Sequence, residues 1–415
     1  MNFKLACVSC GKEFASDSQA MTCLECGAFK GTLDVVYSYE TLKAHYRDGL
    51  PQPGKQSVFE SFLPILPFAD LASLPPIPVG NTPMFKSPNL SAELKLSNLW
   101  LKDDGRNPSA SLKDRASAVA IAMAKESKAS IIAAASTGNA ASSLATLAAS
   151  TSMKTILFVP KTIPKPKLAQ LLIHGAEIIC LDCSYDEAFD LCQKACDKFG
   201  WYNRNTAVNP YTGEGKKTAA LEIACVLQKA PDAVICPVGD GCIISGLYKG
   251  FTDLKNLGLI SQIPRLYGVQ ALGAAPLVKA YETNSEIKPL TNICTIADSI
   301  SVGYPRDGVK ALRAIRNSGG AMVAVSDDEI LKAQKLLASK AGVFAEPAAS
   351  AAIAGLLKLQ VMKSITTDET IVTLLTGHGL KDIASVMNNT KMEVEILKPD
   401  MDSISARIRK IISSI

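Results

Sequence analysis

Hydrophobic and polar positions alternate in blocks along most of the chain. From Leu99 onward, short apolar runs are separated by longer amphipathic or alanine-rich stretches. The apolar runs predict strands at Leu99–Leu101, Ile131–Ala135, Thr155–Val159, Glu177–Leu181, Ala233–Pro237, Leu266–Gln270, Ala321–Val325 and Ile371–Leu375. The stretches between them predict helices at Asp114–Glu126, Ala140–Ala149, Tyr185–Phe199, Glu214–Gln228, Asp327–Lys340 and Ala348–Leu359. This order is typical of a doubly wound α/β fold with mostly parallel strands, whose functional loops share one edge.

Composition narrows the kind of protein. The 415 residues can bury a large core. The net charge of +5 is spread along the chain, so neither nucleic acid nor an anionic membrane is expected as a partner. The N-terminus lacks the pattern of a secretory signal, and no apolar run approaches the roughly 18 residues that span a bilayer. We therefore expect a soluble cytoplasmic protein.

The first part of the chain follows another pattern. Cys7-x-x-Cys10 and Cys23-x-x-Cys26 have the spacing of a zinc ribbon, in which four thiolates form a closed tetrahedral site typical of structural zinc. A ribbon that has lost its metal and a redox pair are the alternatives. A proline-rich but apolar passage follows from Pro51 to Pro83, and we expect it to be irregular chain packed on the main body.

One lysine stands at a predicted helix start. Ser111 and Asp114 have the spacing of a capping box, which would place Lys113 in the first helical turn. The positive field there, together with burial, lowers the pKa of a lysine and leaves a neutral amine that can attack an aldehyde. An ordinary solvated lysine fits the same local pattern.

Three turns of small residues each follow a predicted strand. They are Ser136-Thr137-Gly138-Asn139, Gly239-Asp240-Gly241-Cys242-Ile243 and Thr376-Gly377-His378-Gly379. Such turns expose backbone N–H groups that bind carboxylates or phosphates. His378 is a candidate acid or base, although a histidine in a turn is more often a structural hydrogen-bonding residue. Each turn alone fits a plain connection, but a parallel sheet would gather all three at one edge.

In this order the motifs resemble those of the threonine synthases, a family of fold type II pyridoxal-phosphate (PLP) enzymes related to the tryptophan synthase β subunit. The resemblance runs through Gly80-Asn81-Thr82-Pro83, Ser111–Arg115, Ser136–Asn139, Asn209-Pro210, Glu214–Thr218, Val238–Gly241, Ala345-Glu346-Pro347 and Thr376–Asp382. It implies two doubly wound α/β domains with the cofactor between them, behind a small N-terminal zinc ribbon. A homodimer is the usual assembly of the family.

The resemblance also implies a division of the chain. We expect the ribbon at 1–35, a lead-in packed on the large domain at 36–110, a small α/β domain at 111–205, the large cofactor-binding domain at 206–395 and a helical tail at 396–415.

The resemblance further implies roles for individual residues. Lys113 would form the Schiff base with PLP and later move protons. The other cofactor contacts would be Asn139 at the phenolic oxygen, Thr376 at the pyridine nitrogen, and Gly239, Asp240, Gly241, Cys242 and Ile243 at the phosphate. The substrate carboxylate would meet Ser136, Thr137 and Gly138. The family reaction converts O-phosphohomoserine and water to threonine and phosphate.

The chain departs from the family pattern where the substrate phosphate would bind. Many threonine synthases have Ser at the position of Ala207, Arg at that of Thr212 and Asn at that of Asp240. Lys216 or Lys217 could supply the missing positive charge.

These departures leave a second hypothesis, another fold type II lyase or β-replacement enzyme, similar to threonine or serine ammonia-lyases, acting on a different amino acid. Thr376 with the following Gly-His-Gly-Leu-Lys-Asp favours the first hypothesis. The intact Lys113 and glycine-rich turns argue against a catalytically idle scaffold.

Overall fold

The computed structural model describes residues 3–18, 20–389 and 396–413. The chain divides into two compact units, Met1–Lys381 and Asp382–Ile415. The last residues expected in the large domain, 390–395, and the last two of the expected tail, 414–415, lie outside the described residues. No helix in the described ranges has the length and apolar character needed to cross a lipid bilayer.

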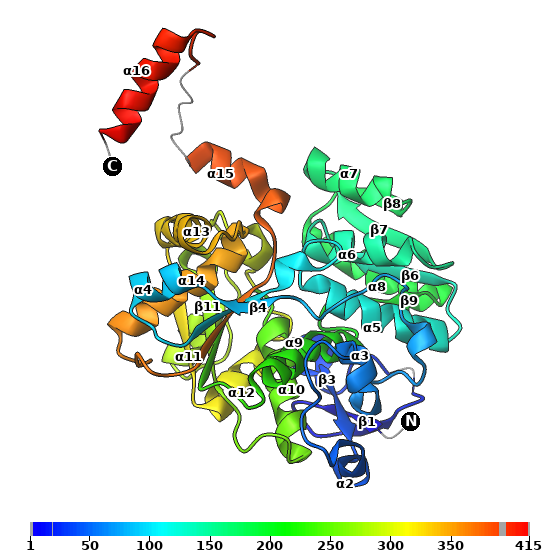
Figure 1. Cartoon of the computed structure of the whole chain (residues 1–415). Helices are drawn as coiled ribbons and strands as arrows, with labels where there is room; N and C mark the ends of the chain where they lie inside the picture. Colours follow the sequence, from blue (N-terminus) through cyan, green and yellow to red (C-terminus); the bar gives the residue numbers. More distant parts are fainter. Residues whose placement is uncertain (1–2, 19, 390–395, 414–415) are drawn as a thin grey trace. The chain divides into compact units, whose positions relative to one another are not determined.

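Two parallel sheets form the centre of the larger unit (Figure 1). The large sheet has the order β12 (Ala321–Val325), β11 (Arg265–Ala271), β10 (Ala233–Pro237), β13 (Ile371–Leu375), β5 (Leu99–Asp103) and β4 (Met84–Lys86). Only the β4–β5 pair in it is antiparallel. The small sheet has the order β8 (Glu177–Leu181), β7 (Lys154–Pro160), β6 (Ile131–Ala135) and β9 (Tyr202–Asn203), all parallel. The doubly wound parallel fold predicted from the pattern is confirmed.

Helices cover these sheets. After β5, the helices of the larger unit are α5 (Lys113–Glu126), α6 (Asn139–Ala148), α7 (Lys165–Ile173), α8 (Tyr185–Phe199), α9 (Tyr211–Leu227), α10 (Cys242–Asn256), α11 (Pro276–Glu282), α12 (Gly308–Ser318), α13 (Asp327–Ala341) and α14 (Pro347–Val361). Short helices α1 (Gly27–Lys30), α2 (Tyr39–Leu42), α3 (Val58–Ser61) and α4 (Pro88–Leu94) precede them. The second unit contains α15 (Ile383–Asn389) and α16 (Met401–Ile412).

The predicted strands and helices agree with the observed ones to within a few residues at each end. The segment expected as a lead-in is more than packed chain, because β4 and β5 pair into the large sheet through Leu99 and Ile371. Strand β5 therefore belongs to the large sheet, while α5, which follows it, packs on α6 and α9. This crossing of the chain brings Lys113 to the space between the sheets.

The N-terminal residues form a three-stranded antiparallel sheet, in the order β2 (Glu13–Ala15), β1 (Phe3–Cys7) and β3 (Leu33–Tyr37). It packs on the main body through Tyr37, whose hydroxyl donates to Glu214 of α9 at 2.6 Å. Asp34 of the same strand forms ion pairs with Lys310 and Arg313 of α12.

Candidate active site

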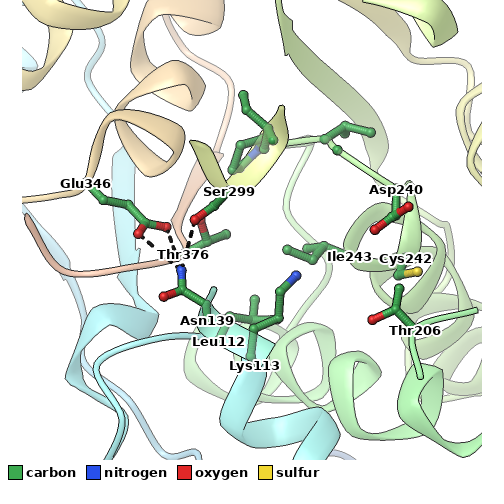
Figure 2. A pocket seen from close by; sticks show the side chains of 15 residues that line it. Leu112, Lys113, Asn139, Thr206, Asp240, Cys242, Ile243, Ser299, Glu346 and Thr376 are labelled. Carbon is green, nitrogen blue, oxygen red and sulfur yellow. Dashed lines mark hydrogen bonds between the residues drawn. The ribbon is translucent and has the colours of Figure 1, made fainter. Parts of the chain in front are cut away.

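A pocket opens where the carboxyl ends of β6, β10 and β13 meet the first turn of α5 (Figure 2). Its lining residues are Leu112, Lys113, Asn139, Thr206, Pro237, Val238, Gly239, Asp240, Gly241, Cys242, Ile243, Ser299, Ile300, Glu346 and Thr376. Loops from both sheets thus contribute to a single pocket, as expected for the carboxyl edge of parallel strands.

Lys113 is the first residue of α5, and Figure 2 shows its side chain pointing into the pocket. Burial lowers the pKa of Lys113, an effect that Arg204 reinforces and that Cys242, Asp240 and Glu346 oppose. Because the pKa is lowered, a larger share of the amine is neutral and able to act as a nucleophile.

The capping box expected at this helix is wrong. Leu112 is the N-cap residue, and no hydrogen bond reaches the Ser111 hydroxyl. The carboxylate of Asp114 instead accepts from the backbone and hydroxyl of Ser109, at 2.6 and 2.5 Å. The preceding loop, not Ser111, therefore holds the start of α5.

Asn139 begins α6 at the rim of the pocket. Its amide nitrogen donates to both carboxylate oxygens of Glu346 and to the hydroxyl of Ser299, each at 3.1 Å (Figure 2). Burial raises the pKa of Glu346. These bonds fix the orientation of the Asn139 amide.

The turn after β10 has the backbone form that anions require. Gly241 has φ +91°, and it precedes the first residue of α10, Cys242, without providing a side-chain cap. The first N–H groups of α10 are consequently available to a ligand. A side chain at Gly241 would also place its Cβ 2.7 Å from the Cβ of Ala311. Only glycine fits both the conformation and the space.

Asp240 lies in the same turn, where burial raises its pKa. Its carboxylate accepts from the backbone N–H of Arg306 at 3.2 Å, and its carbonyl accepts from that of Asp307 at 2.9 Å. Asp240 thus holds the turn against the segment before α12.

The turn after β13 closes the pocket opposite α10. Thr376 lines the pocket, and its carbonyl accepts from the backbone of Leu112 at 2.8 Å. A Cβ on Gly377 would lie 2.4 Å from a carboxylate oxygen of Glu346, so glycine is required for their contact. His378 is absent from the pocket lining; its Nδ1 accepts from the backbone of Leu380 at 3.1 Å, which fits the structural interpretation.

A second cleft meets the first at Asn139. Its lining residues are Thr137, Gly138, Asn139, Ser142, Lys167, Gln170, Leu171 and Lys381. Lys381 donates to Ser109 and Ser142, while Lys167 pairs with Asp298 at 2.5 Å. Ser136 lines neither cleft, and its hydroxyl accepts from the backbone of Gly138 at 3.2 Å.

Lys216 and Lys217, which were both considered for binding the substrate, have different surroundings. The ammonium of Lys217 donates to Glu214 at 2.5 Å, to Asp253 at 2.7 Å and to the carbonyl of Ile65 at 2.6 Å. The structure corrects the assignment of Lys217, because all three of its donors are used inside the protein, away from the pocket. Lys216 is buried without a hydrogen-bond partner among the described residues, and it interacts electrostatically with Cys242 and Lys113.

The four N-terminal cysteines come together. The sulfur atoms of Cys7, Cys10, Cys23 and Cys26 lie within 4.8 Å of one another, and those of Cys10 and Cys23 are 3.8 Å apart. Tetrahedral zinc with Zn–S bonds of ~2.3 Å separates its sulfurs by about 3.8 Å. The four residues therefore fit a zinc ion.

Sequence reasoning assigned no role to four residues near the pocket: Ser299, Glu346, Arg204 and Lys381. Glu346 and Lys381 lie inside the motifs that carry the family resemblance, and Glu346 also precedes a proline at a helix start. The sequence therefore held a signal for both residues. Ser299 and Arg204 lie in segments without any such signal.

Known proteins resemble this chain over most of its length. Residues 77–377 match the family model described as pyridoxal-phosphate dependent enzyme. A threonine synthase from Methanocaldococcus jannaschii is 38% identical over 393 residues, which is 94% of this chain and 96% of the relative. A threonine synthase from Methanosarcina acetivorans is 36% identical over 411 residues, 98% of each chain.

Solved structures share the fold. Threonine deaminase isoform 2 from Solanum lycopersicum superposes with a TM-score of 0.66 at 23% identity, covering 83% of this chain and 96% of the other. At that identity the likeness concerns the arrangement of the sheets and helices.

Proposed function

The chain belongs to the threonine synthases among the pyridoxal-phosphate-dependent enzymes, and from this premise we propose that it converts O-phosphohomoserine and water to threonine and phosphate. The observation that carries the proposal is the meeting of Lys113, Asn139 and the glycine turn in one pocket. Each of these features comes from a different sheet edge or helix start, yet all face the same space.

The pocket fits PLP. An amine with a lowered pKa at Lys113 suits the cofactor's aldehyde, and the uncapped start of α10 suits its phosphate. We assign the neutral hydroxyl of Thr376 to the pyridine nitrogen and Asn139 to the phenolic oxygen, since both residues line the pocket. We assign Gly239, Asp240, Gly241, Cys242 and Ile243 to the cofactor phosphate.

The chain's own residues supply binding and proton transfer. When bound, PLP supplies an electron-withdrawing ring that favours loss of protons next to the substrate's amino group. Lys113 would accept and return protons at the substrate Cα, since burial lowers the pKa of its amine. The Thr137–Gly138 turn would hold the substrate carboxylate, with Lys381 at the same cleft.

Ammonia-lyase activity is the second candidate, because Ala207, Thr212 and Asp240 differ from the usual phosphate contacts. The similarity to threonine synthases over 94% and 98% of the chain favours the first. Purified protein should release phosphate from O-phosphohomoserine and form threonine in equal amount. Formation of ammonia and a keto acid from serine or threonine, without phosphate release, would instead establish the lyase.

The cofactor assignment is tested at Lys113. The Lys113→Ala variant should lose both the yellow colour of bound cofactor and the linkage that borohydride reduces. Lys229→Ala, at an exposed position, is the matched control and should keep both. A borohydride adduct of unchanged yield in Lys113→Ala would refute the role of Lys113.

For the ribbon we propose a structural zinc ion bound by Cys7, Cys10, Cys23 and Cys26. The donor set is closed, with no place for substrate, and the sulfur spacing suits the metal. Elemental analysis should find one zinc per chain, and Cys10→Ser with Cys26→Ser should reduce it to background. Full zinc content in that double variant would contradict the site.

We also propose that the protein works in the cytoplasm as a homodimer, the usual assembly of the family. Light scattering of the purified full chain should give twice the mass of 44.0 kDa.

A further inference from the structure

Two buried cations beside the pocket form no ion pair with any carboxylate of the described residues. Arg204 and Lys216 are each 1% exposed. Within residues 3–18, 20–389 and 396–413, the guanidinium of Arg204 donates only to neutral hydroxyls, those of Ser117 at 3.2 and 3.3 Å and of Thr206 at 3.5 Å. In the described part of the chain, the Lys216 ammonium has no hydrogen-bond partner at all.

Other buried cations of α5 and α9 are paired. Lys217, the next residue of α9, binds Glu214 and Asp253, and Arg115 of α5 binds Asp104 at 2.6 Å and Glu222 at 2.5 Å. Leaving a charge buried and unpaired is strongly unfavourable. Lys217 and Arg115 thus each have a carboxylate partner, whereas Arg204 and Lys216 have none in the described part of the chain.

Both cations lie next to residues that line the pocket, although neither belongs to the lining itself. Lys216 interacts electrostatically with Cys242, Lys113 and Arg204, and Arg204 interacts with Cys242 in turn. Thr206, which accepts from Arg204, lines the pocket itself. Burial and the neighbouring cations lower the pKa of Lys216 to about 8, and burial lowers that of Arg204 to about 10. An anion bound beside Cys242 would compensate the positive charge of both cations.

We propose that Arg204 and Lys216 bind the phosphate ester of the substrate, at a site separate from the glycine turn that takes the cofactor phosphate. The inference rests on the proposed function and names the part of the pocket that recognises its substrate. Two phosphates need two sets of donors, and the turn supplies backbone N–H groups for only one of them. Arg204 directly follows β9, and Lys216 lies in α9.

The positions expected for this role from the family pattern are not available. The Thr212 hydroxyl donates to the carbonyl of Asn209 at 2.9 Å, and its side chain is 2% exposed. Ala207, with φ +64°, has no polar side chain. Arg204 and Lys216 therefore replace the missing charge from other places in the sequence.

The test uses the holoenzyme, in which the cofactor already fills its own phosphate site. Lys216→Met and Arg204→Gln should each raise the KM for O-phosphohomoserine and the inhibition constant of inorganic phosphate by about 10- to 100-fold, the usual effect of a charged hydrogen bond. The dissociation constant of PLP should change little. Lys229→Met, exposed and remote from the pocket lining, should alter none of these values.

A second measurement does not depend on turnover. Inorganic phosphate should raise the melting temperature of the wild-type holoenzyme by mass action, and this shift should vanish in both variants. Unchanged phosphate protection in the variants overturns the proposal, as does a weakened affinity for PLP with unchanged phosphate inhibition. If O-phosphohomoserine is not converted but phosphate protection still needs both cations, the proposed function fails while the anion site stands.

Discussion

At the scale of single residues, the surroundings of the pocket are marked by buried cations that form no ion pair within the described residues. Lys216 is the clearest, because its ammonium faces Cys242, Lys113, Arg204 and Asp307, which together offer two cations against one carboxylate. Burial and these cations lower the pKa of Lys216 from 10.5 to about 8. In the unfolded chain the lysine keeps its ordinary pKa, so the folded state binds its proton more weakly.

The sign of the resulting pH dependence follows. Between pH 8 and 10.5 Lys216 binds more protons in the unfolded chain than in the folded one, so the contribution of Lys216 to stability rises with pH across this range. At pH 7 the charged Lys216 therefore destabilises the cofactor-free protein by roughly 3 kcal/mol. Lys216→Met should be more stable than wild type by about that amount at pH 7, and the advantage should disappear toward pH 10.5, by urea unfolding without phosphate. A variant less stable than wild type at pH 7 would contradict this account.

At the scale of elements, the close approach of α5, α9 and α10 positions the site. A Cβ on Gly215 of α9 would lie 2.1 Å from the carbonyl oxygen of Arg115, and one on Gly250 of α10 would lie 2.6 Å from that of Lys217. Glycine at these positions lets backbones touch, which brings Lys113, Lys216 and Cys242 to one place.

Alanine at two positions of α9 should have opposite effects. Gly215→Ala must push α5 away and should lower the free energy of unfolding by about 2 kcal/mol or more. Gly213→Ala meets nothing within 4 Å and should raise it by up to about 1 kcal/mol through helix propensity. Thermal unfolding of both proteins decides the matter, and equal effects would show that packing against α5 is loose.

At the scale of the whole molecule, the ribbon is joined to the catalytic body by a charged contact. Burial alone would raise the pKa of Asp34, but Lys310 and Arg313 outweigh it and lower the value to about 2. Stability from this contact is therefore present above pH 3.8 and is lost as pH falls toward 2.

Removing this charge should loosen the ribbon. Asp34→Asn should lower the protection of the β1 and β3 amides against hydrogen exchange at pH 7 by about 2 kcal/mol. Asp17→Asn, at an exposed position of the ribbon, provides the control and should leave it unchanged. Equal protection in wild type and Asp34→Asn would mean that the apolar contacts alone hold the ribbon.

The sequence by itself determined the eight strands from β5 to β13 other than β9, six of the longer helices and the motifs around Lys113, Asn139, Gly241 and Thr376. Apolar runs, glycine turns and short motifs are local signals, and a parallel sheet gathers its carboxyl-end loops without further information. The spacing of the four cysteines likewise indicated their cluster, since two tight turns bring thiols together.

Only the tertiary structure decided which lysine lies next to the pocket lining. Lys216 and Lys217 are neighbours in sequence, but successive residues of a helix point about 100° apart, so one meets Asp253 and the other meets Cys242. Arg204 and Glu346 acquire their surroundings from segments far away along the chain, as the bond between Glu346 and Asn139 shows. Burial and pairing of a charge depend on such long-range contacts, and no local pattern encodes them.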